Sequence, residues 1–291
     1  MNDMALDDLP ALKDILHEHE LRAKKSLGQN FLLDLNITRK IARLANARAG
    51  TSFVEVGPGP GGLTRGLLME GVDRLLVIER DVRVLPILKE IAAHSPGTVS
   101  VEIGDALKVD WAAENLGFSL EENLSGPIEL VSNLPYNIGT VLLTNWLEMD
   151  WPLPIACMTL MFQEEVAERI VAKPGSKAYG RLSVLANWRC DTEIVYRLPR
   201  DAFTPPPKIS SAIVQLRPKE TLEYTPSPLM FRQVTAAAFG QRRKMLRASL
   251  KSLSKDIVSI LTELEIDPTA RAETLQWQDY CRLAMALEDL S

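Results

Sequence analysis

The stretch that decides the fold is Ser52-Phe53-Val54-Glu55-Val56-Gly57-Pro58-Gly59-Pro60-Gly61-Gly62. Its first five residues form a short apolar run, which predicts a buried strand. The glycines that follow predict a turn into a helix, where the backbone approaches a ligand closely at the helix N-terminus. The spacing Gly57-x-Gly59-x-x-Gly62 also fits the dinucleotide-binding pattern, so this stretch alone leaves NAD and S-adenosylmethionine both open.

Runs of the same kind recur after this stretch and alternate with helical patterns. The predicted strands are Ser52–Val56, Arg74–Glu79, Val99–Ile103, Ile128–Ser132, Ala156–Phe162, Thr192–Tyr196 and Ser211–Leu216. The predicted helices between them are Leu63–Glu70, Val82–Ala93, Thr140–Met149, Gln163–Ala172 and Tyr179–Arg189. This alternation predicts a doubly wound, mostly parallel seven-stranded sheet, with the last two strands as an antiparallel pair at its edge.

A polar, proline-rich segment, Arg217–Pro228, predicts a linker. Only helical patterns follow it, and Thr274 is the expected cap of the last one. These helices are Leu229–Phe239, Arg242–Ser252, Ile257–Leu264 and Thr274–Glu288. We therefore expect an acidic N-terminal extension over residues 1–21, an α/β domain over 22–217 and a small all-helical domain over 218–291.

The composition is that of a globular protein without a membrane or metal signature. Among 291 residues, 46% are hydrophobic and 24% charged, and no apolar run approaches the roughly 20 residues of a membrane helix. The N-terminus is acidic and lacks the apolar core of a signal peptide, so a cytoplasmic protein is expected. Cys157, Cys190, Cys281 and the three histidines have no metal-ligand spacing, which predicts neither a disulfide framework nor a metal site.

The net charge of −5 argues mildly against a nucleic-acid ligand, but the charges are segregated. Residues 231–255 contain basic side chains and no acid, and residues 22–43 contain a single acid, Asp34. Such segregation predicts one basic face able to bind a polyanion. The candidate RNA-binding residues are Lys24, Lys25, Arg242, Arg243, Lys244 and Arg247.

The tetrapeptide Asn133-Leu134-Pro135-Tyr136 follows the fourth predicted strand. The amide oxygen of Asn133 and the carbonyl oxygen of Leu134 can accept hydrogen bonds from the two N–H groups of an exocyclic amine, and Tyr136 can stack on the base. Taken alone, four letters fit an ordinary strand end and proline turn better than a base pocket. Their context decides between these interpretations.

Acidic residues follow the first strands in order. Glu55 lies just before the first glycine, a placement typical of methyl-donor folds, in which an acid lies near the ammonium end of the methionine. Asp105 follows the third strand, where it can accept a hydrogen bond from the adenine amine of the cofactor. Glu79 ends the second strand and suits ribose hydroxyls, which both candidate cofactors carry. With Asn133, these residues should converge at the carboxyl edge of the sheet, and together they favour S-adenosyl-L-methionine.

From about Lys25 to the C-terminal helices, the chain resembles the small-subunit (16S) ribosomal RNA adenine N6,N6-dimethyltransferases. The resemblance rests on five motifs. They are Lys25–Leu32 (KSLGQNFL), Glu55–Gly62, Asn133–Tyr136, Arg197–Pro199 with Phe203–Lys208 (RLP and FTPPPK), and Phe239–Lys244 (FGQRRK).

The resemblance implies a Rossmann-like methyltransferase whose cofactor contacts are Asn30, Leu32, Gly57, Gly59, Glu79, Asp105 and Asn133. It implies that Asn133–Tyr136 are catalytic, and that Tyr136 and Phe203 sandwich the target adenine. The implied reaction converts two adjacent adenines near the 3′ end of small-subunit ribosomal RNA to N6,N6-dimethyladenosine, during late subunit assembly. The implied partner is the immature small subunit, with no metal and no membrane, and the protein is expected to be a monomer.

The expected chemistry needs no histidine. Two acceptors on the adenine amine would localise its lone pair for in-line attack on the sulfonium methyl, with the protein supplying proximity and orientation. Three alternatives stay open: a large-subunit ribosomal RNA dimethyltransferase of the macrolide-resistance type, an assembly checkpoint factor that mainly binds, and an NAD oxidoreductase. The last lacks a His or Tyr–Lys proton donor and leaves Asn133–Tyr136 unexplained.

Overall fold

The computed structural model describes residues 6–24, 27–111 and 128–290, and these form two compact units. The first contains Met1–Ala167 with Glu193–Pro218, and the second contains Glu168–Thr192 with Lys219–Ser291. The structure thus groups residues 168–192 with the C-terminal helices, whereas the sequence-based division places them in the larger domain. Independent folding of the predicted domains stays a prediction.

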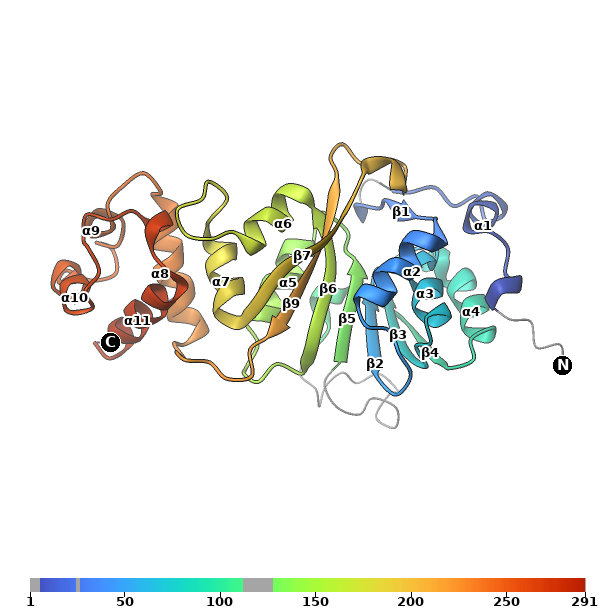
Figure 1. Ribbon diagram of the computed structural model, residues 1–291, viewed down its shortest axis with the longest axis horizontal. Coiled ribbons are helices and arrows are strands. Elements are labelled where there is room, and N and C mark those ends of the chain that lie inside the picture. Colours follow the sequence, from blue (N-terminus) through green and yellow to red (C-terminus); the bar gives the residue numbers. More distant parts are fainter. Residues whose placement is uncertain (1–5, 25–26, 112–127, 291) are drawn as a thin grey trace. The chain divides into compact units, whose positions relative to one another are not determined.

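The main sheet has the strand order β4-β3-β2-β5-β6-β9-β7 (Figure 1). Its strands are β2 (Ser52–Val56), β3 (Arg74–Glu79), β4 (Thr98–Ile103), β5 (Ile128–Asn133), β6 (Ile155–Gln163), β7 (Cys190–Leu198) and β9 (Ser211–Pro218). The first five are parallel to their neighbours, and β9 runs antiparallel to β6. The predicted doubly wound, mostly parallel seven-stranded sheet is confirmed.

The helices of the first unit are α1 (Leu12–Glu18), α2 (Leu35–Leu44), α3 (Gly62–Met69), α4 (Leu85–Ala93) and α5 (Gly139–Leu147). Figure 1 shows α2, α3 and α4 grouped beside the β4–β3–β2 half of the sheet. The sequence analysis did not identify α1 or α2. The signal for α2 was present, because Asp34 caps it by accepting the Asn36 N–H at 2.8 Å and Thr38, Ile41 and Ala42 are buried at helical spacing.

A second, two-stranded sheet joins segments far apart in the sequence. Its strands β1 (Phe31–Leu32) and β8 (Phe203–Thr204) are antiparallel, with Phe31 opposite Thr204 and Leu32 opposite Phe203. The N-terminal motif KSLGQNFL and the motif FTPPPK therefore meet through backbone hydrogen bonds.

The predicted N-terminal extension packs onto the first unit. Leu6, Leu9, Ile15 and Leu21 belong to its hydrophobic core cluster. The guanidinium of Arg65 in α3 is buried and donates hydrogen bonds to the carbonyls of Pro10 at 2.7 Å, Leu6 at 3.3 Å and Leu9 at 3.4 Å. The segment is therefore held both by apolar burial and by a buried cation.

The second unit is built from helices. Besides the end of α6 (Glu164–Val171) they are α7 (Arg181–Arg189), α8 (Pro228–Gly240), α9 (Leu246–Ser249), α10 (Ile257–Glu263) and α11 (Trp277–Glu288). Aromatic rings join them, with ring centroids 4.3 Å apart for Trp188 and Phe231 and 5.6 Å apart for Phe239 and Tyr280.

The predicted helix Arg242–Ser252 is wrong, because only Leu246–Ser249 is helical. The first two residues of this short helix are bonded to another segment: the N–H of Leu246 donates to the carbonyl of Ala270 at 2.8 Å, and the N–H of Arg247 donates to that of Pro268 at 3.0 Å. A helix starting at Arg242 would need those N–H groups for its own carbonyls.

The predicted cap at Thr274 is also wrong. That residue ends the short 3-10 turn Ala272–Thr274, and α11 begins at Trp277. Gln276 occupies the cap position, where its N–H donates to the side chain of Asp279 at 3.0 Å. A capping box, in which the acid sits three residues inside the helix, has replaced the expected threonine cap.

None of the helices in the described part of the chain has the length and apolarity that crossing a membrane requires. Within the same residues, no three His, Cys, Asp or Glu side chains gather in a way that suits a metal ion.

Candidate functional site

A pocket lies at the carboxyl ends of β2 and β5, where the order of the parallel strands reverses. Open parallel sheets bind ligands at such a switch point. The lining consists of residues 27–32, 57–60 and 133–138 together with Glu55, Gly62, Leu63, Glu79 and Arg80. The pocket thus brings together three motifs that the sequence analysis singled out.

The glycine turn is shaped by its neighbours. Gly57 and Gly59 have positive φ angles of 69° and 55°, a conformation that favours glycine. Gly62 has a different reason to be glycine, because a Cβ there would come 2.2 Å from the carbonyl oxygen of Leu32. Its place in the dinucleotide-like spacing therefore follows from the close approach of β1 and carries no information about a pyrophosphate.

Glu79 ends β3 with its carboxylate fixed by the backbone. Its Oε2 accepts the Gly59 N–H at 3.0 Å, and its Oε1 accepts the N–H groups of Arg80 and Asp81 at 2.7 Å each. Burial raises the pKa of Glu79, and these three hydrogen bonds oppose that shift. A carboxylate has about four acceptor positions, so one remains for a ligand hydroxyl.

Glu55 lies on β2 and is only 1% exposed. It accepts a hydrogen bond from the hydroxyl of Thr64 at 2.7 Å. Burial raises the pKa of Glu55 to about 8, although the bond from Thr64 lowers it. Since Glu55 lines the pocket, a cation placed there would stabilise its ionised form.

Asn133 is oriented by the N-terminal motif. Its amide nitrogen donates to the carbonyl of Asn30 at 3.1 Å, which leaves Oδ1 as the atom that can accept a hydrogen bond. The hydroxyl of Tyr136 lies 2.7 Å from the hydroxyl of Ser211 at the start of β9. The side chains of Asn133 and Tyr136 are therefore held in one orientation before any ligand binds.

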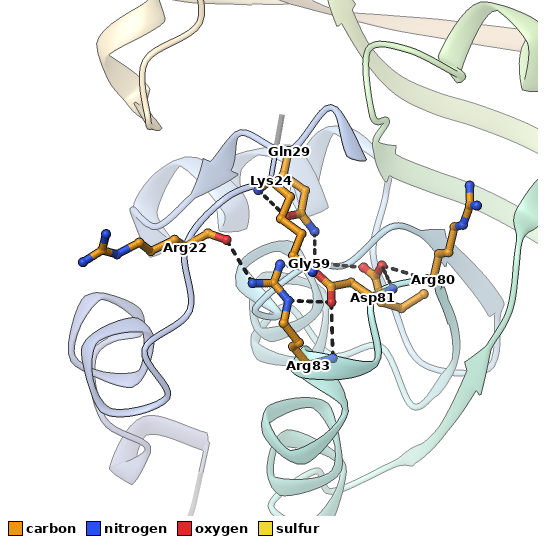
Figure 2. A network of polar contacts seen from close by, with 8 residues as sticks. Arg22, Lys24, Gln29, Gly59, Arg80, Asp81 and Arg83 are labelled. Atoms are coloured by element: carbon orange, nitrogen blue, oxygen red, sulfur yellow. Dashed lines mark hydrogen bonds and ion pairs between the residues drawn. The ribbon is translucent and has the colours of Figure 1, made fainter. Parts of the chain in front are cut away.

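A polar network ties the N-terminal motif to the end of β3 (Figure 2). Gln29 accepts the Lys24 N–H at 2.9 Å and donates to Asp81 at 3.0 Å. Arg83 grips the same carboxylate through Nε at 2.9 Å and through a terminal nitrogen at 2.5 Å, and it also donates to the Arg22 carbonyl at 3.3 Å. The bonds from Arg83 lower the pKa of Asp81 to about 2, so this acid stays ionised.

The sequence analysis missed Gln29, Asp81 and Arg83. Asp81 stands two residues after Glu79, where a turn acid is common. Nothing in the spacing shows that it contacts Gln29, which lies 52 positions earlier in the chain. Only the fold makes that contact visible.

Two predicted site residues lie outside the pocket lining. Asp105 caps a short turn by accepting the Leu107 N–H at 3.1 Å, and it pairs with Arg80 at 3.5 Å. Phe203 is 2% exposed and belongs to the hydrophobic core cluster, so its ring is covered by other side chains in this structure, and its stacking on the target adenine stays a prediction. Stacking of Phe203 on a base would require the segment after β7 to move.

The candidate RNA-binding residues differ in their surroundings. Arg242 pairs with Glu273 at 2.8 Å and donates to the Lys177 carbonyl at 2.8 Å. Arg243, Lys244 and Arg247 are exposed, as is Lys24. Lys25 lies outside the described residues.

The side chains of the pocket fit S-adenosylmethionine better than a dinucleotide. Glu79 offers an acceptor for ribose hydroxyls, and Glu55 offers a buried carboxyl group that an ammonium would stabilise. The pyrophosphate of NAD offers Glu55 no cation, and its negative charges would oppose the ionisation of both acids. The sheet order and this pocket define a Rossmann-like methyltransferase that uses S-adenosylmethionine.

A family model described as "Ribosomal RNA adenine dimethylase" matches residues 20–289, and the chain belongs to this family. It is 56% identical over 283 residues to "Ribosomal RNA small subunit methyltransferase A" of Cereibacter sphaeroides, covering 97% of this chain and 99% of that one. It is 55% identical over 284 residues to the protein of the same name from Mesorhizobium japonicum, with 96% and 99% covered.

Solved structures agree with this assignment. A dimethyladenosine transferase from Plasmodium falciparum matches with a TM-score of 0.71 and 25% identity, over 88% of this chain and 96% of that one. The 23S rRNA methyltransferase ErmE shares the fold, with a TM-score of 0.65 and 24% identity over 89% of this chain and 100% of that one. The predicted family, enzyme class and cofactor are confirmed: the chain is an S-adenosylmethionine-dependent ribosomal RNA adenine dimethyltransferase.

Proposed function

We propose that the protein dimethylates N6 of two adjacent adenines near the 3′ end of small-subunit ribosomal RNA, within an immature small subunit. The names of relatives at 55–56% identity support the choice of the small subunit. The observation that carries the chemistry is the fixed amide of Asn133, which lines the cofactor pocket with its oxygen left as an acceptor.

The adenine amine is a weak nucleophile because its lone pair is delocalised into the ring. The Asn133 oxygen and the Leu134 carbonyl would accept hydrogen bonds from its two N–H groups and so localise the lone pair on the nitrogen. Bound S-adenosylmethionine supplies a methyl group already activated by the positive sulfur. The chain then contributes position and orientation, and the proton leaves to water after attack.

The cofactor roles follow the pocket. Glu79 would bond the ribose hydroxyls and Glu55 the ammonium, while Asn30, Leu32, Gly57 and Gly59 line the space between. The contact of Asp105 with the cofactor adenine stays a prediction. Asp105 follows β4 at the same edge of the sheet, with Arg80 between it and the pocket.

Base recognition would rest on Tyr136. Its ring is half-buried and its hydroxyl is anchored at Ser211, so the face can hold a flipped adenine at a low entropic cost. Phe203 would join it only if its ring, which is buried in this structure, becomes exposed when RNA binds.

The test is methyl transfer to purified ribosomal particles. The protein and labelled S-adenosylmethionine are incubated with immature small subunits and, separately, with large subunits, and the dimethylated adenines are mapped by mass. We expect two adjacent sites in small-subunit RNA and none with Asn133→Ala. Methylation confined to large-subunit RNA would overturn the proposal, and tight binding without any transfer by the wild-type protein would favour a purely assembly role.

Monomeric state and cytoplasmic location remain predictions of the same proposal. Sedimentation of the purified protein checks the first, and fractionation of cells checks the second.

A further inference from the structure

An open groove of about 820 Å³ lies between α1 and the turn that follows β8. Its lining includes Lys13 and His17 of α1, Arg22 after the helix, Thr204 and Pro205 at the end of β8, and Phe31 of β1. Phe31 also lines the cofactor pocket, so the groove and the pocket share one wall.

The α1 wall is fixed at both ends. Arg65 binds the carbonyls of Leu6, Leu9 and Pro10 before the helix, and Arg83 binds the carbonyl of Arg22 after it. Between these points Leu12 and Ile15 are buried. The segment is therefore a built part of the first unit and offers a stable surface to a ligand.

Charges on this segment are sorted by face. Residues 13, 16 and 17 lie on one face of α1 at the three- and four-residue spacing of a helix, Glu20 follows the end of the helix, and all four line the groove. The acids Asp14 and Glu18 do not line it, which leaves Glu20 as the acid among the lining residues. Although the extension is acidic by composition, it presents Lys13 and Arg22 to the groove, with His17 between them.

Arg22 is available to a ligand. Figure 2 shows its side chain extending away from Arg83, which bonds only its carbonyl. The side chains of Lys13, His17 and Arg22 are all exposed.

We propose that this groove binds the RNA strand next to the target adenine, with Lys13 and Arg22 on phosphates and a ring N–H of His17 on a phosphate or sugar oxygen. This inference rests on the proposed function. Thr204 and Pro205 of the segment FTPPPK line the groove, and Phe31, which β1–β8 pairing sets opposite Thr204, lines both the groove and the cofactor pocket. Positive side chains beside a base pocket match the phosphates that flank a flipped base. Such contacts fix the position of the strand and do not read its sequence.

The test compares Lys13→Ala, Arg22→Ala and the matched control Lys89→Ala, an exposed lysine of α4 outside the groove. All three variants remove one positive charge. Binding of immature small subunits is measured over a salt series, donor affinity is measured by calorimetry, and methylated adenines are mapped. We expect each groove variant to weaken binding several-fold at low salt and to lower the log–log salt slope by about 0.7–0.9, as expected for one lost phosphate contact.

In the expected result Lys89→Ala behaves as wild type, donor affinity is unchanged in all three variants, and the same adenines are modified. Equal effects of Lys13→Ala, Arg22→Ala and Lys89→Ala on the salt slope would overturn the inference, since net charge alone would then explain them.

A second measurement places the RNA directly. 4-Thiouridine is introduced on either side of the target adenines, and the peptides crosslinked by light are identified. Crosslinks from the RNA to residues 13–23 support the groove. RNA crosslinks confined to other peptides overturn it, and so does a crosslink that joins residues 13–23 to a ribosomal protein and not to RNA. If the wild-type protein methylates no small-subunit RNA, the proposed function fails, while the salt series and the crosslinks still report on the groove.

Discussion

At the scale of single residues, Asn133 performs its proposed role through one atom. The bond from its amide nitrogen to the Asn30 carbonyl orients the group, so the oxygen is the atom that can meet the adenine amine. We expect Asn133→Ala to slow methyl transfer by roughly 100-fold or more, the scale seen for loss of one oriented polar contact to a reacting group.

Single-turnover transfer at saturating RNA measures this effect, with Asn145→Ala on the exposed side of α5 as the matched control. A near-wild-type rate in Asn133→Ala would remove the orienting role. A loss of rate in the control variant would point to general damage near α5.

Glu79 gives the second prediction at this scale. Its carboxylate is already oriented by three backbone N–H groups, so a ribose hydroxyl would meet an acceptor that needs no rearrangement. Glu79→Ala should weaken donor binding by about 1.5–3 kcal/mol, the range for hydrogen bonds to charged groups. Calorimetric titration with S-adenosylmethionine checks this, and an affinity equal to that of Glu90→Ala on the exposed face of α4 would exclude Glu79 from the site.

At the scale of elements, the network of Gln29, Asp81 and Arg83 links the N-terminal motif to β3. Asp81 touches no expected ligand, so it acts as a positioning residue for Asn30 and Glu79 on either side of the pocket. Asp81→Ala should raise the KM for S-adenosylmethionine several-fold and leave kcat nearly unchanged once the donor saturates the enzyme.

A double-mutant cycle with Gln29→Ala separates this role from simple destabilisation. We expect a coupling free energy of about 0.5–3 kcal/mol in donor binding, the usual range for residues in direct contact. Additive effects would show that the two residues act independently. A fall in kcat alone would contradict a role in donor positioning.

The basic stretch 231–255 divides at the element scale as well. Arg242 is held by Glu273 and the Lys177 carbonyl, whereas Arg247 is exposed at the start of α9. Arg247→Ala should therefore lower the log–log salt slope of RNA binding by about 1, and Arg242→Ala should mainly reduce stability. The check is a salt series for each variant together with its thermal midpoint; the reverse pattern would contradict the assignment.

Elements also show what could be predicted from sequence. The sheet followed from apolar runs at regular spacing, because burial on both faces leaves a simple pattern. The helix expected at Arg242 failed because hydrogen bonds to Pro268 and Ala270 override local propensity. In the site, glycines and acids at strand ends were recognisable. The burial of Phe203 and the reach of Gln29 to Asp81 depend on long-range pairing, which no local pattern records.

At the scale of the whole molecule, Glu55 makes the stability of the free protein depend on pH. The pKa of Glu55 is about 8 in the folded chain, above its ordinary value of 4.5. A raised pKa means that the folded state holds the proton more tightly. The associated stability is present below about pH 4.5 and is lost as the pH rises towards about 8.

Glu55→Gln removes this dependence. The unfolding free energy of the wild type relative to Glu55→Gln should fall across that window by up to roughly 1.4 kcal/mol per pH unit. Denaturant unfolding of both proteins without cofactor measures the difference. A difference that does not vary with pH would show that Glu55 titrates normally. Bound S-adenosylmethionine should reduce the effect if its ammonium lies beside Glu55 as proposed, because a cation there would stabilise the ionised carboxylate.

The small sheet formed by β1 and β8 links the binding of the two substrates. A sheet of two strands with two residues each gains little from its own hydrogen bonds, so the order of each strand depends on the other strand and on the core that buries Phe31, Leu32 and Phe203. β1 carries residues of the cofactor pocket, and β8 is the beginning of FTPPPK, the segment that lines the groove through Thr204 and Pro205. Anything that orders one strand therefore orders the other. We therefore expect donor and nucleic acid to strengthen each other's binding by the same factor, so neither would have to arrive first.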